Sequence, residues 1–164
     1  MNKFTWRFDI QIPNESEFRV ARRIIGFKGG NMKRIIDMCK FRDASGMHGV
    51  KLRLRGKGSG FKEGPNNTES DDDLHLCVSS KFLEASSLDF SSIFPMHRES
   101  VMIAFETFKF ACNSIEALLI KIYDDYKKFM KEKYNLNINM MIKKYENNPA
   151  ILFSQMECYP PCSV

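Results

Sequence analysis

The sequence has few of the residues from which metal centres and disulfide frameworks are built. Its 164 residues include only three His, far apart, and five Cys, an odd number with no Cys-x-x-Cys pair. Two Cys four residues apart near the end are too isolated, in a Pro-rich stretch, to predict a zinc site. We therefore expect reduced thiols, no metal site and no cofactor.

Long apolar runs and catalytic constellations are also missing. No stretch approaches the ~20 apolar residues of a membrane span, and the first residues lack the apolar segment of a secretory signal. We expect a nuclear or cytoplasmic protein, or one found in both places, with no membrane partner. No Ser/His/Asp or Cys/His set has a supporting context. The stretch GKGS at residues 56–59 lacks the first Gly and the following helix of a P-loop. These absences predict a protein that is not an enzyme.

The residues that are present predict a folded, basic protein with an uneven charge distribution. Apolar residues make up 43% and charged residues 27% of the chain, which is typical of a globular protein. Residues 1–63 contain 15 Lys/Arg and 6 Asp/Glu, a net charge of +9, whereas residues 64–164 contain 10 and 14, a net charge of −4. A basic half attracts a polyanion, although a solvated charged surface is the alternative interpretation.

The most informative motif lies in the basic half, where residues 24–35 read IIGFKGGNMKRI. Two aliphatic residues lead into Gly-x-x-Gly, and an amphipathic basic helix follows directly. Gly lacks Cβ, so a phosphate can approach the backbone closely. The N-terminus of the following helix adds unpaired N–H groups and the positive end of a dipole, and Lys28 adds a formal charge. The motif predicts a grip on the backbone of a single nucleic-acid strand.

Hydrophobic periodicity predicts the elements around the motif. Residues 4–12 and 50–55 alternate as half-buried strands, and residues 74–78 form a third. One helix is expected between residues 14 and 25 and another over residues 30–41. Residues 46–49 form a turn, 56–73 a long mobile loop and 81–96 an irregular insert ending at Pro95. A final helix covers residues 98–133, and the Asn-rich tail suggests at most one short helix near residues 140–145.

The element order β-α-α-β-β-α, with Gly-x-x-Gly between the first two helices, resembles the eukaryotic type I KH domain. The motif also follows the family pattern, with Met32 where Ile or Leu is usual. The resemblance implies an α+β fold: a three-stranded antiparallel sheet covered by three helices, the last one extended. It divides the chain into a KH domain over residues 1–134 and a partly ordered tail over residues 135–164.

A finer resemblance lies in the second strand and the loop after it. KLRLRGKGS at residues 51–59, FKEG at 61–64 and DDLHL at 72–76 are similar to the STAR and branch-point-binding-protein group of KH domains. In that group the long loop helps to hold single-stranded RNA. The group's second RNA-binding helix is not recognisable after residue 134, and the insert 81–96 is longer than the group has. STAR-like target sequences are therefore not implied.

The resemblance implies that about four unpaired nucleotides lie in a cleft. One wall is the first helix, the Gly-x-x-Gly and the start of the second helix; the other is the second strand and its loop. The implied RNA-binding residues are, for the phosphates, Gly26, Phe27, Lys28 and Gly29; for the apolar floor under the bases, Ile25, Met32 and Leu54; for the start of the second helix, Lys33; and for the rim and the closing loop, Arg19, Arg55, Phe61 and Lys62.

Several alternatives stay open at this point. Phe27 is unusual between the two Gly and either stacks on a base or is incidental. The pattern fits single-stranded DNA as well as RNA, because contacts to the 2′-OH cannot be read from residue types. The functions expected are RNA processing, such as splicing, or post-transcriptional regulation. The alternative is a KH-fold scaffold with weak or lost nucleic-acid binding, which meets a protein partner or a second copy through the final helix and the insert 81–96.

Overall fold

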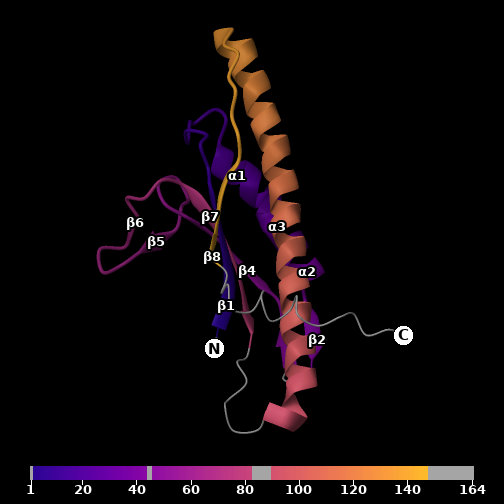
Figure 1. Cartoon of the computed structure of the whole chain (residues 1–164). Helices are drawn as coiled ribbons and strands as arrows, with labels where there is room; N and C mark the ends of the chain where they lie inside the picture. The colour runs from indigo at the N-terminus through magenta and orange to yellow at the C-terminus, as the bar shows by residue number, and fades with distance from the viewer. Residues whose placement is uncertain (1, 44–45, 83–89, 148–164) are drawn as a thin grey trace.

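A four-stranded antiparallel sheet lies at the centre of the fold, as seen in a computed structural model that describes residues 2–43, 46–82 and 90–147 (Figure 1). The strand order is β4-β7-β1-β8, from strands β1 (Asn2–Asp9), β4 (Val50–Arg55), β7 (His75–Phe82) and β8 (Lys143–Asn147). The long helix α3 (Phe90–Tyr134) runs along one face of the sheet. The predicted mixture of helices and antiparallel strands is confirmed.

Strand β1 shows why the predicted alternation builds the core. Phe4 and Phe8 are buried and Trp6 is half-buried, all on the side of the sheet that meets α3. The ring of Phe108 from α3 lies 5.8 Å from that of Phe4, between centroids. The intervening polar residues point to the opposite face, as the period of two in a strand requires. The strand ends at Asp9 rather than at residue 12, but Ile10 and Ile12 beyond it are still buried.

The two helices around the Gly-x-x-Gly are shorter than the periodicity predicts. Helix α1 (Val20–Ile25) begins only after Arg19, whose left-handed backbone (φ 55°) separates it from the preceding turn. Helix α2 (Gly30–Met38) ends where Cys39 donates backbone hydrogen bonds to Ile35 and Ile36. Between them lies one 3₁₀ turn, η1 (Phe27–Gly29). The chain then enters a two-stranded hairpin, β2 (Phe41–Asp43) and β3 (Gly46–His48), where the sequence predicts a helix end and a turn.

The loop over residues 56–73 is more regular than predicted. It contains a second hairpin, β5 (Lys62–Glu63) paired with β6 (Thr68–Glu69). The sequence predicts a long mobile loop here, and this short hairpin within it was not anticipated. The hairpin has only two residues in each strand, too few for the alternation by which strands are recognised.

Helix α3 begins earlier than predicted. Strand β7 extends to Phe82 and α3 starts at Phe90, so the helix includes Pro95, which the sequence interpretation placed at the end of an irregular insert. Residues 83–89 of that insert lie outside the described residues. Apolar residues spaced by three and four along α3 face the sheet and are buried at Val101, Phe108, Cys112, Ile115, Leu119, Ile122 and Tyr126. No described helix is long and apolar enough to cross a membrane.

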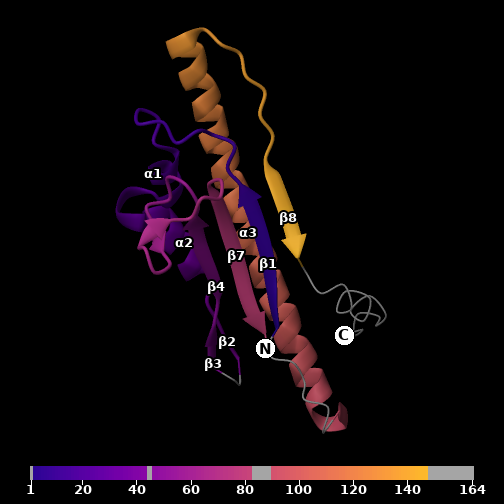
Figure 2. The same ribbon diagram turned by 90° about the vertical axis from the view of Figure 1, so that its left-hand side faces the viewer.

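The tail returns along the sheet instead of forming a helix near residues 140–145. Asn135 ends α3 in a left-handed conformation (φ 52°) and donates its N–H to the Lys131 carbonyl at 3.0 Å, a common helix end. Strand β8 then pairs antiparallel with β1 (Figure 2), and Lys144 forms an ion pair with Glu116 of α3 at 3.0 Å. The predicted three-stranded sheet is thus corrected to four strands. The division of the chain at residue 134 stays a prediction.

Candidate nucleic-acid interface

The Gly-x-x-Gly loop, residues 26–29, has a backbone that few other residues would allow. Gly26, Lys28 and Gly29 all have positive φ, at 81°, 51° and 78°. A Cβ on Gly26 would lie 2.7 Å from Cγ and 2.8 Å from the backbone nitrogen of Asn31. Asn31 in turn donates its side-chain N–H to the Arg23 carbonyl at 3.0 Å. The loop shape is therefore built by close packing against α2, and it requires Gly at position 26.

This loop presents positive charge outward. The N-terminus of α2 has no side-chain cap among the described residues, so the positive end of its dipole faces the loop, although the N–H of Gly30 already bonds to the Phe27 carbonyl and that of Gly29 to the Gly26 carbonyl. Lys28 is exposed and forms no ion pair with any described residue; its ammonium lies 5.4 Å from the centroid of the Phe27 ring. Phe27 itself is 86% exposed. No acidic side chain belongs to the loop, so the site favours a phosphate.

The predicted apolar floor is only partly at the surface. Ile25 and Met32 are half-buried and pack against the core while keeping some exposed area. Leu54 is only 7% exposed, because it lies opposite Leu76 within the sheet. Helix α2 packs next to β4, so all three residues lie between the two walls that the sequence predicts. The floor is aliphatic, which favours van der Waals contact with bases over extended ring stacking.

At the end of β4 the structure brings together two predicted rim residues. The Arg55 guanidinium lies over the Phe61 ring, 3.4 Å from its centroid, and donates a hydrogen bond to the Leu54 carbonyl at 2.9 Å. Lys62 follows in β5 and is exposed. Arg19 lies instead at the start of α1, where its Nε donates to the Ser16 carbonyl at 2.8 Å, and Lys33 is exposed on α2.

Glu69 holds the loop between β4 and β7 in shape. Its carboxylate accepts hydrogen bonds from the backbone N–H groups of Gly58 at 3.0 Å and Gly60 at 2.6 Å. These two bonds lower the pKa of Glu69, because they stabilise the ionised form. Gly58, at φ 83°, approaches Asn14 so closely that a Cβ would lie 2.2 Å from the amide nitrogen. The loop is therefore held in shape by the carboxylate of Glu69, and it packs closely against Asn14 in the segment before α1.

We predict that Glu69→Gln loosens this loop. A neutral amide accepts weaker hydrogen bonds than a carboxylate, and its N–H₂ group faces donors. Because the pKa of Glu69 is lowered in the fold, its contribution is complete above the ordinary carboxyl pKa and is lost as the pH falls through the lowered pKa. Amide hydrogen exchange at Gly58 and Gly60 should be faster in the variant at neutral pH. Equal exchange in both proteins would contradict this role.

Sequence reasoning missed the two residues that shape the site, Asn31 and Glu69. Asn31 stands at a position where the motif pattern accepts any residue, although an Asn beside a Gly is a common signal for local backbone contacts. Glu69 lies eleven residues from Gly58, and no spacing rule links a carboxylate to two backbone N–H groups at that distance. Both residues hold the walls of the site in position, and neither adds positive charge to it.

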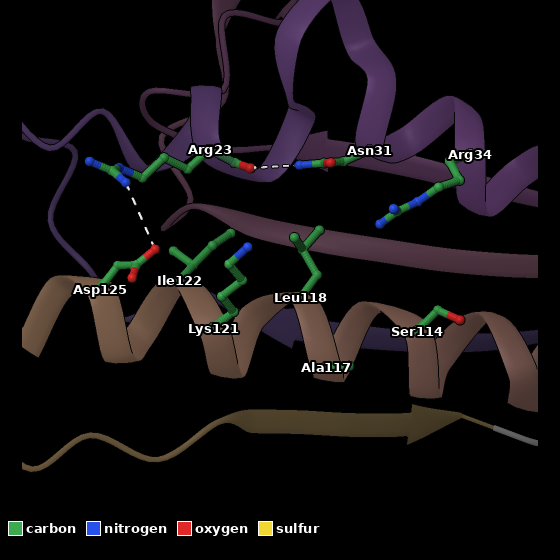
Figure 3. A pocket seen from close by; sticks show the side chains of 9 residues that line it. All are labelled: Arg23, Asn31, Arg34, Ser114, Ala117, Leu118, Lys121, Ile122 and Asp125. Carbon is green, nitrogen blue, oxygen red and sulfur yellow. Dashed lines mark hydrogen bonds and ion pairs between the residues drawn. The ribbon is translucent and has the colours of Figure 1, made fainter.

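A basic hollow of about 480 Å³ lies between α1, α2 and α3 (Figure 3). The side chains of Arg34 and Lys121 reach into this hollow. Across it, a guanidinium nitrogen of Arg23 lies 4.0 Å from a carboxylate oxygen of Asp125. Its lining includes no residue of β4 or of the loop after it, so it is distinct from the predicted cleft. The Arg23–Asp125 pair is partly exposed, which makes it a weak link between α1 and α3.

Within the described ranges, no three His, Cys, Asp or Glu side chains come close enough together to hold a metal ion. No disulfide joins the described cysteines, which are Cys39, Cys77 and Cys112. Burial raises the pKa of the Cys39 and Cys77 thiols, which makes both less reactive at neutral pH.

The segment that contains this site is similar to a known protein family. Residues 14–87 match the family model described as KHDC4/BBP-like, KH-domain type I. Over these residues the chain is similar to type I KH domains. The matched segment runs from the residues before α1 through the Gly-x-x-Gly loop, β4 and β7, and so confirms the resemblance read from the sequence. No curated protein and no solved structure matches the chain. KH domains bind nucleic acid through a Gly-x-x-Gly loop and are not enzymes.

Proposed function

We propose that the KH domain binds about four nucleotides of single-stranded RNA in the cleft between the Gly-x-x-Gly loop and β4. The observation that carries the proposal is the loop itself. Its left-handed backbone, the uncapped N-terminus of α2 and the exposed, unpaired Lys28 converge on one anion-binding surface within the described residues. An aliphatic floor and a rim with Arg55 and Phe61 lie beside it.

In this proposal each part of the site has its own role. Residues 26–29 hold the phosphates through backbone N–H groups and Lys28. The bases lie against the partly exposed Ile25 and Met32, with Leu54 below them. Arg55 and the Phe61 ring stacked on it close one end of the cleft, and Lys62 adds positive charge there. Arg19 and Lys33 contribute attraction at longer range. Phe27 is exposed enough to stack on a base that leaves the cleft.

Binding should be in the micromolar range and should depend on salt. Four nucleotides offer few contacts, and part of the free energy comes from released counterions. Each phosphate contact with a single strand contributes about −0.7 to the slope of log K against log salt. Filter binding of a short RNA across a salt series measures that slope. A slope of zero would contradict a phosphate grip.

We propose a role in RNA processing or post-transcriptional regulation, in the nucleus or the cytoplasm. The similarity of residues 14–87 to the KHDC4/BBP-like family supports this proposal. In vitro selection from pools of single-stranded RNA and DNA tests the ligand class and the bases preferred. Enrichment of a short motif from RNA alone is the expected result, and equal enrichment from DNA would show that the 2′-OH is not read.

One observation favours the alternative function as an interaction scaffold. Four apolar side chains on α3, Met102, Ile103, Phe110 and Ile120, are between 38% and 50% exposed. An exposed apolar stripe on a helix is typical of an interface. Sedimentation of the full chain over a range of concentrations tests for self-association, and a monomer at every concentration would contradict a homodimer.

A further inference from the structure

The sheet has a second face that no described helix covers. Helix α3 packs against the face that carries Phe4, Phe8 and Leu76. In Figure 2 the sheet lies in front of α3, with its other face turned towards the viewer. Because side chains alternate along a strand, the residues of that open face follow from the strand register.

Cations dominate this open face. The register places seven of them there against the single acid Asp9: Lys3, Arg7, Lys51, Arg53, Arg55, Lys81 and Lys143. We name these seven residues the basic sheet face. Asp9 pairs with Arg7, at 2.7 Å from its Nε, and Glu63 of β5 lies 4.0 Å from the Nε of Arg55. Four of these side chains are exposed and form no hydrogen bond or ion pair with any described residue: those of Lys3, Lys51, Arg53 and Lys81.

The arrangement of these cations is unfavourable for folding alone. Lys3 lies directly opposite Lys81 across two strands, and like charges in that position are destabilising. Arg7 and Arg53 flank Cys77. Their positive charges and that of Arg55 act to lower the pKa of the Cys77 thiol, against the larger effect of burial, which raises it. Tyr145, which lies opposite Arg7, adds an aromatic ring that is 55% exposed. A surface with many cations, an exposed aromatic ring and few acidic groups is complementary to a polyanion.

The basic sheet face is continuous with the proposed cleft through β4. Leu54 of β4 points towards the helices, whereas Arg53 and Arg55 on either side of it point to the open face. Arg55 also stacks on Phe61 at the end of the cleft. A strand that leaves the cleft beside Arg55 therefore meets Arg53 and Lys51 next, and then the cations of β7 and β1.

We propose that the basic sheet face binds the phosphate backbone of the same RNA strand beyond the nucleotides held in the cleft. The inference rests on the proposed function, since it assigns that RNA a second contact surface. It extends the footprint from about four nucleotides to a length that crosses the sheet. The contacts are with phosphates, so they add affinity without base preference.

The test compares two lengths of RNA with the full chain: a tetranucleotide and a single strand of about 20 nucleotides. The variant is Lys3→Glu with Lys81→Glu, far along the sheet from the Gly-x-x-Gly loop. The matched control is Lys128→Glu with Lys131→Glu on exposed positions of α3, which changes the net charge equally. The single variant Lys3→Glu is a further control for folding, because it places a negative charge directly opposite Lys81, a pair that favours the fold.

We expect the double variant on the sheet to bind the long RNA about tenfold more weakly, with a salt slope smaller by about 1.4 for two lost phosphate contacts. Binding of the tetranucleotide should stay unchanged, and the control should match the wild type with both RNAs. Lys3→Glu should show a smaller loss on the long RNA only.

The other outcomes separate this inference from the proposed function. If the sheet variant binds the long RNA as the wild type does, the sheet contact is wrong while the cleft stands. If the wild type binds no tetranucleotide, the cleft is wrong. If polyglutamate competes for the basic sheet face as well as RNA of equal charge does, the face takes any polyanion and the assignment to RNA is overturned.

Discussion

Lys28→Asp should weaken the binding of short single-stranded RNA about 10- to 100-fold without changing the stability of the fold. A hydrogen bond to a charged group contributes about 1.5–3 kcal/mol, and reversal of the charge adds repulsion. Lys28 is exposed and has no ion pair among the described residues, so its loss costs the fold little. Its left-handed backbone, at φ 51°, is one that Asp also adopts readily.

Lys28→Asn is the matched variant for this experiment. Asn tolerates the same left-handed backbone, so the loop keeps its shape while the charge is removed rather than reversed. Binding should fall less than in Lys28→Asp, and both variants should unfold at the denaturant concentration of the wild type. Unchanged RNA binding in Lys28→Asp would mean that the loop does not hold a phosphate.

Phe108→Ala should have the largest effect on stability of any single change considered. Phe108 is fully buried between α3 and the sheet, with its ring centroid 5.8 Å from that of Phe4 and 6.3 Å from that of Trp6. Truncation of a buried Phe removes apolar burial and leaves a cavity, at a cost of about 3–5 kcal/mol. Denaturant unfolding followed by circular dichroism measures the change in the free energy of unfolding.

Phe110→Ala is the control, two residues along the same helix. Phe110 is 49% exposed, so its truncation should change the free energy of unfolding by less than about 0.5 kcal/mol. A large loss at Phe110 with a small one at Phe108 would mean that α3 turns a different face to the sheet. Self-association through the exposed face of α3 would appear separately, as a dependence of the Phe110 result on protein concentration.

The parts of the fold that follow from the sequence are those with strong local periodicity. The alternation in β1 and the three-and-four spacing in α3 each place one face in the core, and both predictions agree with the burial at Phe8 and Phe108. The Gly-x-x-Gly could be recognised because its glycines are required by the backbone. At Gly26 the close approach of Asn31 shows why.

Strand β8 could not be predicted, since its sequence KKYEN has no apolar alternation. It forms because the free edge of β1 offers unpaired backbone groups, which is a property of the folded sheet and not of residues 143–147. The half-buried Ile138, Met140 and Ile142 pack against the core as the chain returns. Towards the far end of α3, the ring of Phe18 packs edge-on against that of Tyr126, with ring centroids 5.0 Å apart.

Pro95 was misleading for a different reason. Pro lacks an N–H and ordinarily marks the end of a helix, so the sequence places the start of the last helix after it. Helix α3 nevertheless extends over 45 residues and includes Pro95 near its beginning. In a helix of that length, the packing of its buried stripe outweighs one missing backbone hydrogen bond.

The most direct measurement of the central claim is a titration of the ¹⁵N-labelled full chain with a tetranucleotide RNA, followed by amide chemical shifts. We predict that the amides of Phe27, Lys28 and Gly29 shift most, together with those of β4 near Leu54. Smaller shifts should follow in the loop that Glu69 holds. Shifts confined to the exposed face of α3, with the Gly-x-x-Gly amides unmoved, would contradict the account.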